Sequence, residues 1–260
     1  MLAVAPRAWA VDAVANELTV LHHPGSYLRY RMHAHNDNGD QVRDVIESKD
    51  GTVARAILRD GRPLTEEEDK AERDRLGALV AAPSDFARHI HNEEKEKKIA
   101  DDLIRLMSDA MIYTYVPDQP QTGTNHGDRE VVMDFEPNPK FKPPTTAAEA
   151  LTGVKGRVWI DSKTRVVVRI EGNIFQAVNL GWGMLAHIYP GGRVVLDQTN
   201  AGGQRWIYTL FTEQIKARAL LIKDINIQAK YDAEGFQVLS DPVSYQDAIR
   251  ILLDTPLPAN

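Results

Sequence analysis

Residues 153–171, GVKGRVWIDSKTRVVVRIE, decide the fold that we expect for this chain. Apolar residues occupy every second position in two runs, one on each side of a short polar break: first Val158 and Ile160, then Val166, Val168 and Ile170. The break, residues 161–164 (DSKT), begins with an aspartate, a residue that often starts a turn. The stretch therefore predicts a β-hairpin with a four-residue connection of the type I kind.

The same alternation predicts further strands along the chain: residues 27–35, 41–47, 52–58 and 130–136 before the hairpin, and 182–189, 193–199, 206–217 and 221–231 after it. Thr65, followed by Glu68, predicts a capping box that begins a helix reaching about Ala81. Helical periodicity predicts a second helix beyond Ser84 and a third over residues 241–254. The pattern indicates an α+β protein, with residues 11–260 forming a single domain.

Composition excludes several classes of protein. The 260-residue chain contains no cysteine, which excludes disulfides, thiolate metal sites and a cysteine nucleophile. Its net charge of -6 argues against a general nucleic-acid binder. We expect no transmembrane segment, because no run of about 20 apolar residues is present.

The first ten residues, MLAVAPRAWA, end in Ala8-Trp9-Ala10, the small-x-small pattern of a signal-peptidase site. We interpret residues 1–10 as the remnant of a signal peptide, its c-region, and expect the mature protein in the periplasm. An alanine-rich start without a targeting role is the alternative.

No catalytic signature is found, so we expect neither an enzyme nor a cofactor. The chain has no G-x-S-x-G, no phosphate-binding loop and no complete dinucleotide fingerprint. The pair His33/His35 suggests a metal site, but Arg29 and Arg31 share its predicted strand face, so we expect none. A carboxylate hydrolase using Asp134, Glu136 and Asp161 is the weakest alternative.

Apolar residues on the expected strands offer a lining for a ligand cavity. The residues that we expect to line it are Trp159, Trp182, Leu185, Phe211, Ile225 and Ile227. Ordinary core packing is the competing interpretation of the same side chains.

Three segments together resemble the bacterial outer-membrane lipoprotein-sorting (LolA-like) family, in particular its uncharacterised exported members: residues 60–68 (DGRPLTEEE), 132–137 (VMDFEP), and 156–161 (GRVWID) followed by 168–171 (VRIE). The resemblance covers about residues 27–231. It implies a curled antiparallel sheet, an incomplete β-barrel of the LolA/LolB-like kind, covered on its concave side by helices. It also implies export to the periplasm and an apolar hollow that receives acyl chains.

We therefore expect a periplasmic lipid- or lipoprotein-binding carrier or sensor that holds acyl chains without catalysis. The alternative of a different class is an envelope scaffold for protein–protein interaction, with an envelope protein as its partner.

Overall fold

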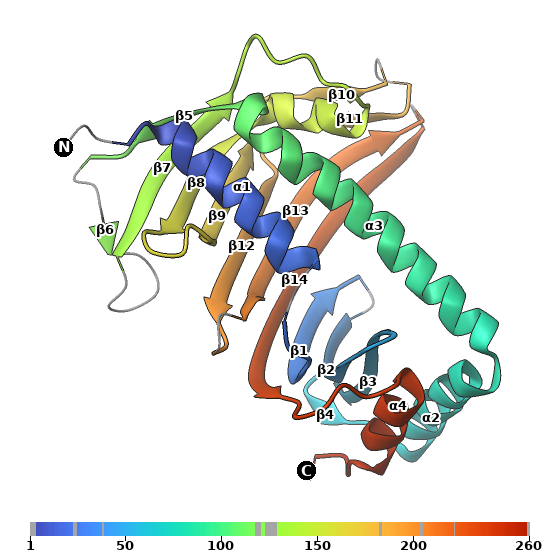
Figure 1. Ribbon diagram of the computed structural model, residues 1–260. Coiled ribbons are helices and arrows are strands. Elements are labelled where there is room, and N and C mark those ends of the chain that lie inside the picture. The colour runs from blue at the N-terminus through green and yellow to red at the C-terminus, as the bar shows by residue number, and fades with distance from the viewer. Residues whose placement is uncertain are drawn as a thin grey trace. The chain divides into compact units, whose positions relative to one another are not determined.

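The computed structural model describes residues 4–22, 25–37, 39–117, 121–122, 129–181, 184–202, 205–220 and 222–258. The chain is α+β, and its antiparallel sheet is not closed (Figure 1), as the sequence predicted. It divides into two compact units, each made of two chain segments: unit 1 comprises residues 1–23 and 98–228, and unit 2 residues 24–97 and 229–260. The single domain expected over residues 11–260 stays a prediction.

Unit 1 contains most of the strands. In spatial order, its main sheet runs β13 (Trp206–Ala219), β12 (Arg193–Asn200), β9 (Val167–Ile174), β8 (Val154–Asp161), β7 (Arg129–Pro137) and β5 (Met111–Tyr115), with each neighbouring pair antiparallel. Three short strands pair outside this path: β6 (Gln121–Thr122) with β7, and β10 (Val178–Leu180) with β11 (Ala186–Ile188), which also pairs with β13. β14 (Lys223–Val238) begins in unit 1 and ends in unit 2.

The hairpin predicted over residues 153–171 is confirmed as β8 and β9. Asp161 Oδ1 accepts hydrogen bonds from the Lys163 and Thr164 backbone N–H groups, at 3.0 and 2.6 Å, so it organises the turn as expected. The regular alternation is interrupted, however, because the pairing passes from Trp159↔Arg169 directly to Ile160↔Val167. Val168 is the extra residue of this β-bulge, which changes the face toward which the start of β9 points.

Two helices cover one face of the unit 1 strands. These are α1 (Pro6–His22) and the later part of α3 (Pro83–Ala110). Figure 1 shows α1 across β8, β9 and β12. A short 3-10 helix, η1 (Ala147–Gly153), precedes β8. The core beneath the helices contains Trp9 and Ala13 of α1, Ala110 of α3 and inward residues of β5, β7 and β8.

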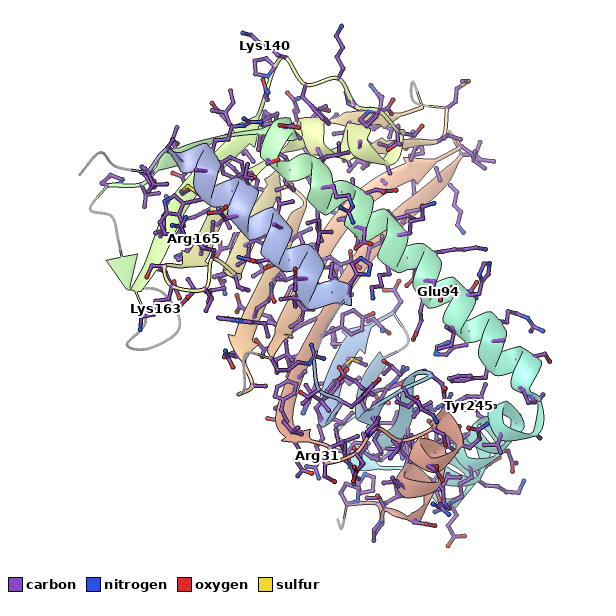
Figure 2. All side chains as sticks on the ribbon, in the orientation of Figure 1. Arg31, Glu94, Lys140, Lys163, Arg165 and Tyr245 are labelled. Atoms are coloured by element: carbon purple, nitrogen blue, oxygen red, sulfur yellow. The ribbon has the colours of Figure 1, made fainter. Side chains whose placement is uncertain are left out.

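α1 was not predicted. Its first residues were interpreted as a signal-peptide remnant, but they belong to a helix in which Trp9 and Ala10 are buried. The Arg165 guanidinium lies 3.6 Å from the centre of the Trp9 ring, and Figure 2 labels Arg165 beside this helix. Cleavage after Ala10 stays a prediction, and it would remove Trp9 from the core.

Unit 2 contains β1 (Leu28–Asn36), β2 (Gly39–Ser48), β3 (Gly51–Arg59), β4 (Arg62–Pro63), the later part of β14, α2 (Glu66–Ala81), the first part of α3 and α4 (Tyr245–Asp254). The order β4-β3-β2-β1-β14 is antiparallel at every step. The predicted capping box is confirmed: Thr65 caps α2 and Glu68 bonds back to the Thr65 backbone. The apolar core packs inner residues of α2, α3 and α4 on β2 and β3.

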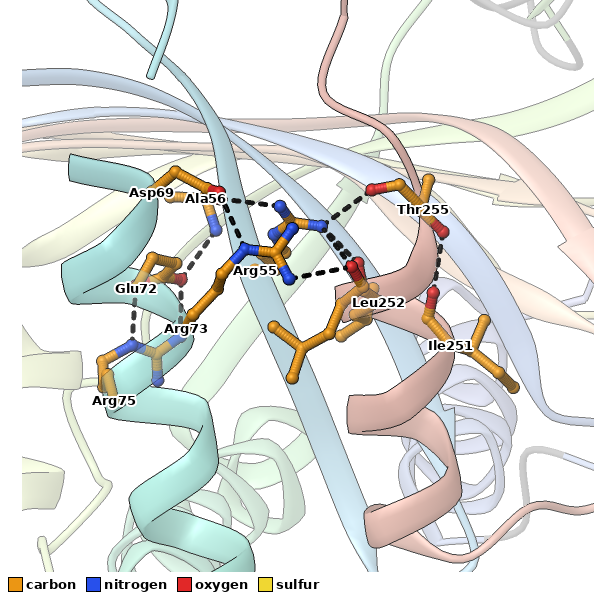
Figure 3. A network of polar contacts seen from close by, with 10 residues as sticks. Arg55, Ala56, Asp69, Glu72, Arg73, Arg75, Ile251, Leu252 and Thr255 are labelled. Atoms are coloured by element: carbon orange, nitrogen blue, oxygen red, sulfur yellow. Dashed lines mark hydrogen bonds and ion pairs between the residues drawn. The ribbon is translucent and has the colours of Figure 1, made fainter. Parts of the chain in front are cut away.

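A buried arginine joins the helices of unit 2 to β3 (Figure 3). Arg55 has no exposed surface. Its guanidinium donates to the backbone oxygens of Leu252 and Thr255 at the end of α4, and to the Asp69 carboxylate of α2 at 2.7 Å. Because helix carbonyls at a C-terminus lack intrahelical partners, this one cation satisfies the end of α4 while binding α2.

Candidate functional site

Unit 1 contains a cavity of about 130 Å³ between its helices and its sheet. Helices α1 and α3 form one wall, and strands β5, β7, β8, β9, β12 and β13 form the other. The cavity is lined by Ala10, Ala13, Val14, Glu17, Ile104, Met107, Tyr113, Phe135, Val158, Ile160, Val167, Ile170, Leu196, Gln198 and Tyr208. Nearly all of these side chains present carbon atoms to the space.

The cavity exists because the inner face of α1 carries small residues. Ala10 and Ala13 are 3% and 4% exposed, so they pack inward, yet a methyl group cannot reach the sheet as a leucine would. Polar contacts hold both ends of α1 in place. Arg7 pairs with Asp109 at 2.5 Å near its start, and His22 Nε2 lies 2.5 Å from Asp101 Oδ2 at its end.

One carboxyl group faces this apolar space. Glu17, 7% exposed, projects from α1 toward the sheet. Its Oε1 accepts from the Val167 N–H at 3.0 Å, and its Oε2 accepts from Gln198 Nε2 at 2.6 Å. The Tyr208 hydroxyl lies 3.4 Å from the same Oε2.

Burial raises the pKa of Glu17 from 4.5 to about 7, because removal from water disfavours the charged form. The hydrogen bonds from Gln198, Val167 and Tyr208 favour the carboxylate and limit this increase. The pKa of the Tyr208 hydroxyl is also raised, first by its own burial and then by Glu17. The phenol therefore remains a neutral donor, while Glu17 changes its charge near neutral pH.

Gln198 leaves one hydrogen-bonding atom unused. Its side chain is 2% exposed, and its Oε1 has no hydrogen-bond partner in the described part of the chain. The cavity therefore has a polar end, with a carboxyl, an amide and a phenol, in an otherwise apolar lining. This arrangement suits an apolar ligand that carries one hydrogen-bonding group.

Of the six residues predicted to line a cavity, five lie away from this cavity, and the sixth is not among the residues that the structure describes. Trp159 projects from the other face of β8 from Val158 and Ile160, and Arg169 lies 5.8 Å from its ring centre. Leu185 is 53% exposed. Phe211, Ile225 and Ile227 are half-buried on β13 and β14, and none of these five is among the described lining residues. Trp182 lies outside the described residues.

The three carboxylates considered for hydrolysis do not form one site. Asp134 makes a two-pronged pair with Arg157 across β7 and β8, with contacts of 2.7 and 3.2 Å. Glu136 is exposed farther along β7, and Asp161 caps the β8–β9 turn. Because Asp134 faces Arg157, Asp161 lies four residues, about 14 Å, farther along the strand.

The side chains of His33, His35 and His89 contact acidic neighbours and do not converge on one site. His33 contacts Glu234, His35 contacts Asp40, and His89 contacts Glu93. Among the residues with a described position, no three histidine or carboxylate groups are placed to hold a metal ion. Within that part of the chain there is also no helix with the length and apolar character needed to cross a membrane.

The sequence reasoning missed Glu17, Gln198 and Tyr208. A signal for α1 was present, since Trp9, Ala13 and Glu17 recur every four residues, as on one face of a helix. A glutamate in that stripe predicts a solvated edge, so its burial could not be inferred from the pattern alone.

Comparison of the chain with protein-family models, with curated proteins and with solved structures gives no match, so the site is defined by its geometry alone.

Proposed function

We propose that unit 1 is a binding module that holds a small apolar group, such as a segment of a lipid acyl chain, in the cavity under α1, without catalysing a reaction. The observation that carries the proposal is an apolar cavity of about 130 Å³ with a single carboxyl group at its polar end. Transport or sensing of lipids or lipoproteins in the periplasm is the wider role that this binding would serve.

The size of the cavity limits the ligand. An engineered apolar cavity of about 150 Å³ remains dry and binds benzene, so this cavity has room for about six carbon atoms. Burial of six methylene groups contributes at most about 5 kcal/mol, so the dissociation constant of such a ligand is about 0.2 mM or higher. A longer chain leaves its remainder outside or requires α1 to move.

The polar end favours a ligand that donates a hydrogen bond. Glu17 accepts such a bond when ionised, and the free Gln198 Oε1 accepts one at any pH. An ionised fatty acid would instead place a second negative charge beside Glu17. An alcohol or an amide-linked chain is therefore preferred to a free fatty acid above pH 7.

A titration with 1-hexanol, followed by the NMR signals of protein methyl groups, tests the proposal. Ala13→Leu adds three carbon atoms to the lining and so occupies about half of the cavity, and Ala15→Leu is the matched control because Ala15 is exposed on the same helix. We expect wild type and Ala15→Leu to bind with the same dissociation constant, and Ala13→Leu to bind at least about tenfold more weakly.

Circular dichroism establishes that both variants fold. If folded Ala13→Leu binds hexanol as well as wild type, or if wild type binds neither hexanol nor longer alcohols, the cavity is not a binding site.

A further inference from the structure

Two hairpins of unit 1 end beside each other, away from the cavity. β11 pairs with the last residues of β13, through Ala186↔Ala219 and Ile188↔Ala217. Beyond the paired strands, the Leu220 N–H donates to the Leu185 backbone oxygen at 3.0 Å. The β10–β11 connection and the β13–β14 connection are thus joined by a backbone hydrogen bond.

Both connections expose large apolar side chains. We call these the hairpin patch: Met184, Leu185, Leu220 and Ile222, which are 60%, 53%, 63% and 86% exposed. Single exposed apolar residues are normal, but four at two joined hairpin ends form a group of the kind that marks an interaction surface.

Leu220 is not explained by local structure. Its φ of 48° lies in the left-handed region, where glycine or asparagine is favoured and a leucine is strained. Since its side chain packs into no core, neither the turn nor the interior accounts for a leucine at this position.

Two exposed lysines lie on the strands next to the hairpin patch. Lys223 directly follows Ile222, and Lys216 lies on β13 four residues, about 13 Å, before Leu220. Neither lysine forms an ion pair with any residue whose position is described. Of the nearby carboxylates, Asp224 pairs with Arg218 at 2.8 Å. Glu149 accepts from the Gly181 N–H at 2.7 Å and keeps its negative charge, so Lys216, Arg218 and Lys223 exceed these two carboxylates by one positive charge. In a chain of net charge -6, this is a local excess of positive charge beside apolar ends.

We propose that the hairpin patch inserts into the surface of a lipid bilayer that contains anionic lipids. Apolar side chains at protruding ends can enter the boundary between headgroups and acyl chains, while Lys216 and Lys223 contact the phosphate groups. The charge pattern selects this occupant, because two unpaired lysines beside apolar residues match an anionic lipid surface. The inference does not depend on a ligand in the cavity.

Co-sedimentation with vesicles tests the proposal, using phosphatidylcholine alone and equal parts of phosphatidylcholine and phosphatidylglycerol. We expect wild type to bind the mixed vesicles and to bind less as salt increases. The double variant Leu220→Ser/Ile222→Ser should bind at least about tenfold more weakly. Lys216→Gln/Lys223→Gln should also weaken binding, by about fivefold per lysine.

Val80→Ser is the control, since Val80 is a 41% exposed apolar residue on α2, far from the patch in sequence. It should bind as wild type does. Absence of wild-type binding, equal binding to neutral vesicles, or no effect of the serine variant overturns the proposal. A wild-type dimer that becomes a monomer in the serine variant also overturns it, because the patch would then join two copies of the chain.

Discussion

The raised pKa of Glu17 should make unit 1 less stable as pH rises from about 4.5 to about 7. The folded pKa of about 7 lies above the ordinary value of 4.5, so the folded chain binds this proton more tightly than the unfolded chain. Below pH 4.5 the carboxyl is protonated in both states, and its stabilising effect is fully present. Between pH 4.5 and about 7 only the unfolded state releases the proton, so the stability is lost over this window.

The magnitude follows from the shift. The rise of the Glu17 pKa from 4.5 to about 7 corresponds to about 3 kcal/mol in the free energy of unfolding. Glu17→Gln removes the titrating group and keeps its shape. A rotation of the Gln198 amide would turn its unused Oε1 toward the new amide, so the variant can retain a hydrogen bond there.

Urea denaturation followed by tryptophan fluorescence measures this effect, because all four tryptophans belong to unit 1: Trp9, Trp159, Trp182 and Trp206. The difference in unfolding free energy between Glu17→Gln and wild type should increase by about 3 kcal/mol, in favour of the variant, from pH 4 to pH 9. Glu136→Gln, an exposed change in the same unit, is the control and should leave the pH dependence unchanged. A difference that stays constant with pH would refute the burial argument.

Three further predictions concern stability and use denaturant unfolding followed by circular dichroism. Arg55→Met should lower the free energy of unfolding by about 3–5 kcal/mol, because buried backbone oxygens of α4 lose their donor. The exposed control Arg88→Met should lower it by less than about 0.5 kcal/mol. Equal losses in the two variants would contradict the role of the Arg55 network. Gly156→Ala should lower the free energy of unfolding by about 3 kcal/mol or more, since a Cβ there would lie 1.8 Å from a backbone oxygen of the facing strand. Gly77→Ala, in open space on helix α2, is the control and should stabilise the protein. A Gly156→Ala variant as stable as wild type would show that the two strands separate easily. Trp9→Ala should cost about 3–5 kcal/mol, and a negligible loss would mean that α1 contributes little to the core.

Local patterns predicted much of the secondary structure. Alternation located β1, β2, β3, β7, β8 and β9, and the capping box located the start of α2. These signals depend on residues close together in the chain, so they can be read without tertiary information. The predicted strand over residues 182–189 was too long, because its described strand is only Ala186–Ile188.

The cavity could not be derived in the same way. The bulge at Val168 reverses the alternation at the start of β9, so faces inferred by counting are wrong beyond that point. The polar end joins Glu17 to Gln198, 181 positions later, and no local pattern reports such a pairing. A cavity forms where side chains from distant parts of the chain leave space between them. Local sequence patterns do not show where that happens.

The place of α1 in the chain affects how the protein can fold during synthesis. Its inner face packs on β5, β7 and β8, which follow it by about a hundred residues or more. During synthesis, Trp9 of α1 therefore stays exposed to solvent while the first strands of unit 2 emerge and pair with one another. Helix α1, which covers the cavity, is synthesised before the strands on which it packs and docks on them late. During this interval α1 is the segment that a chaperone or a protease would bind first.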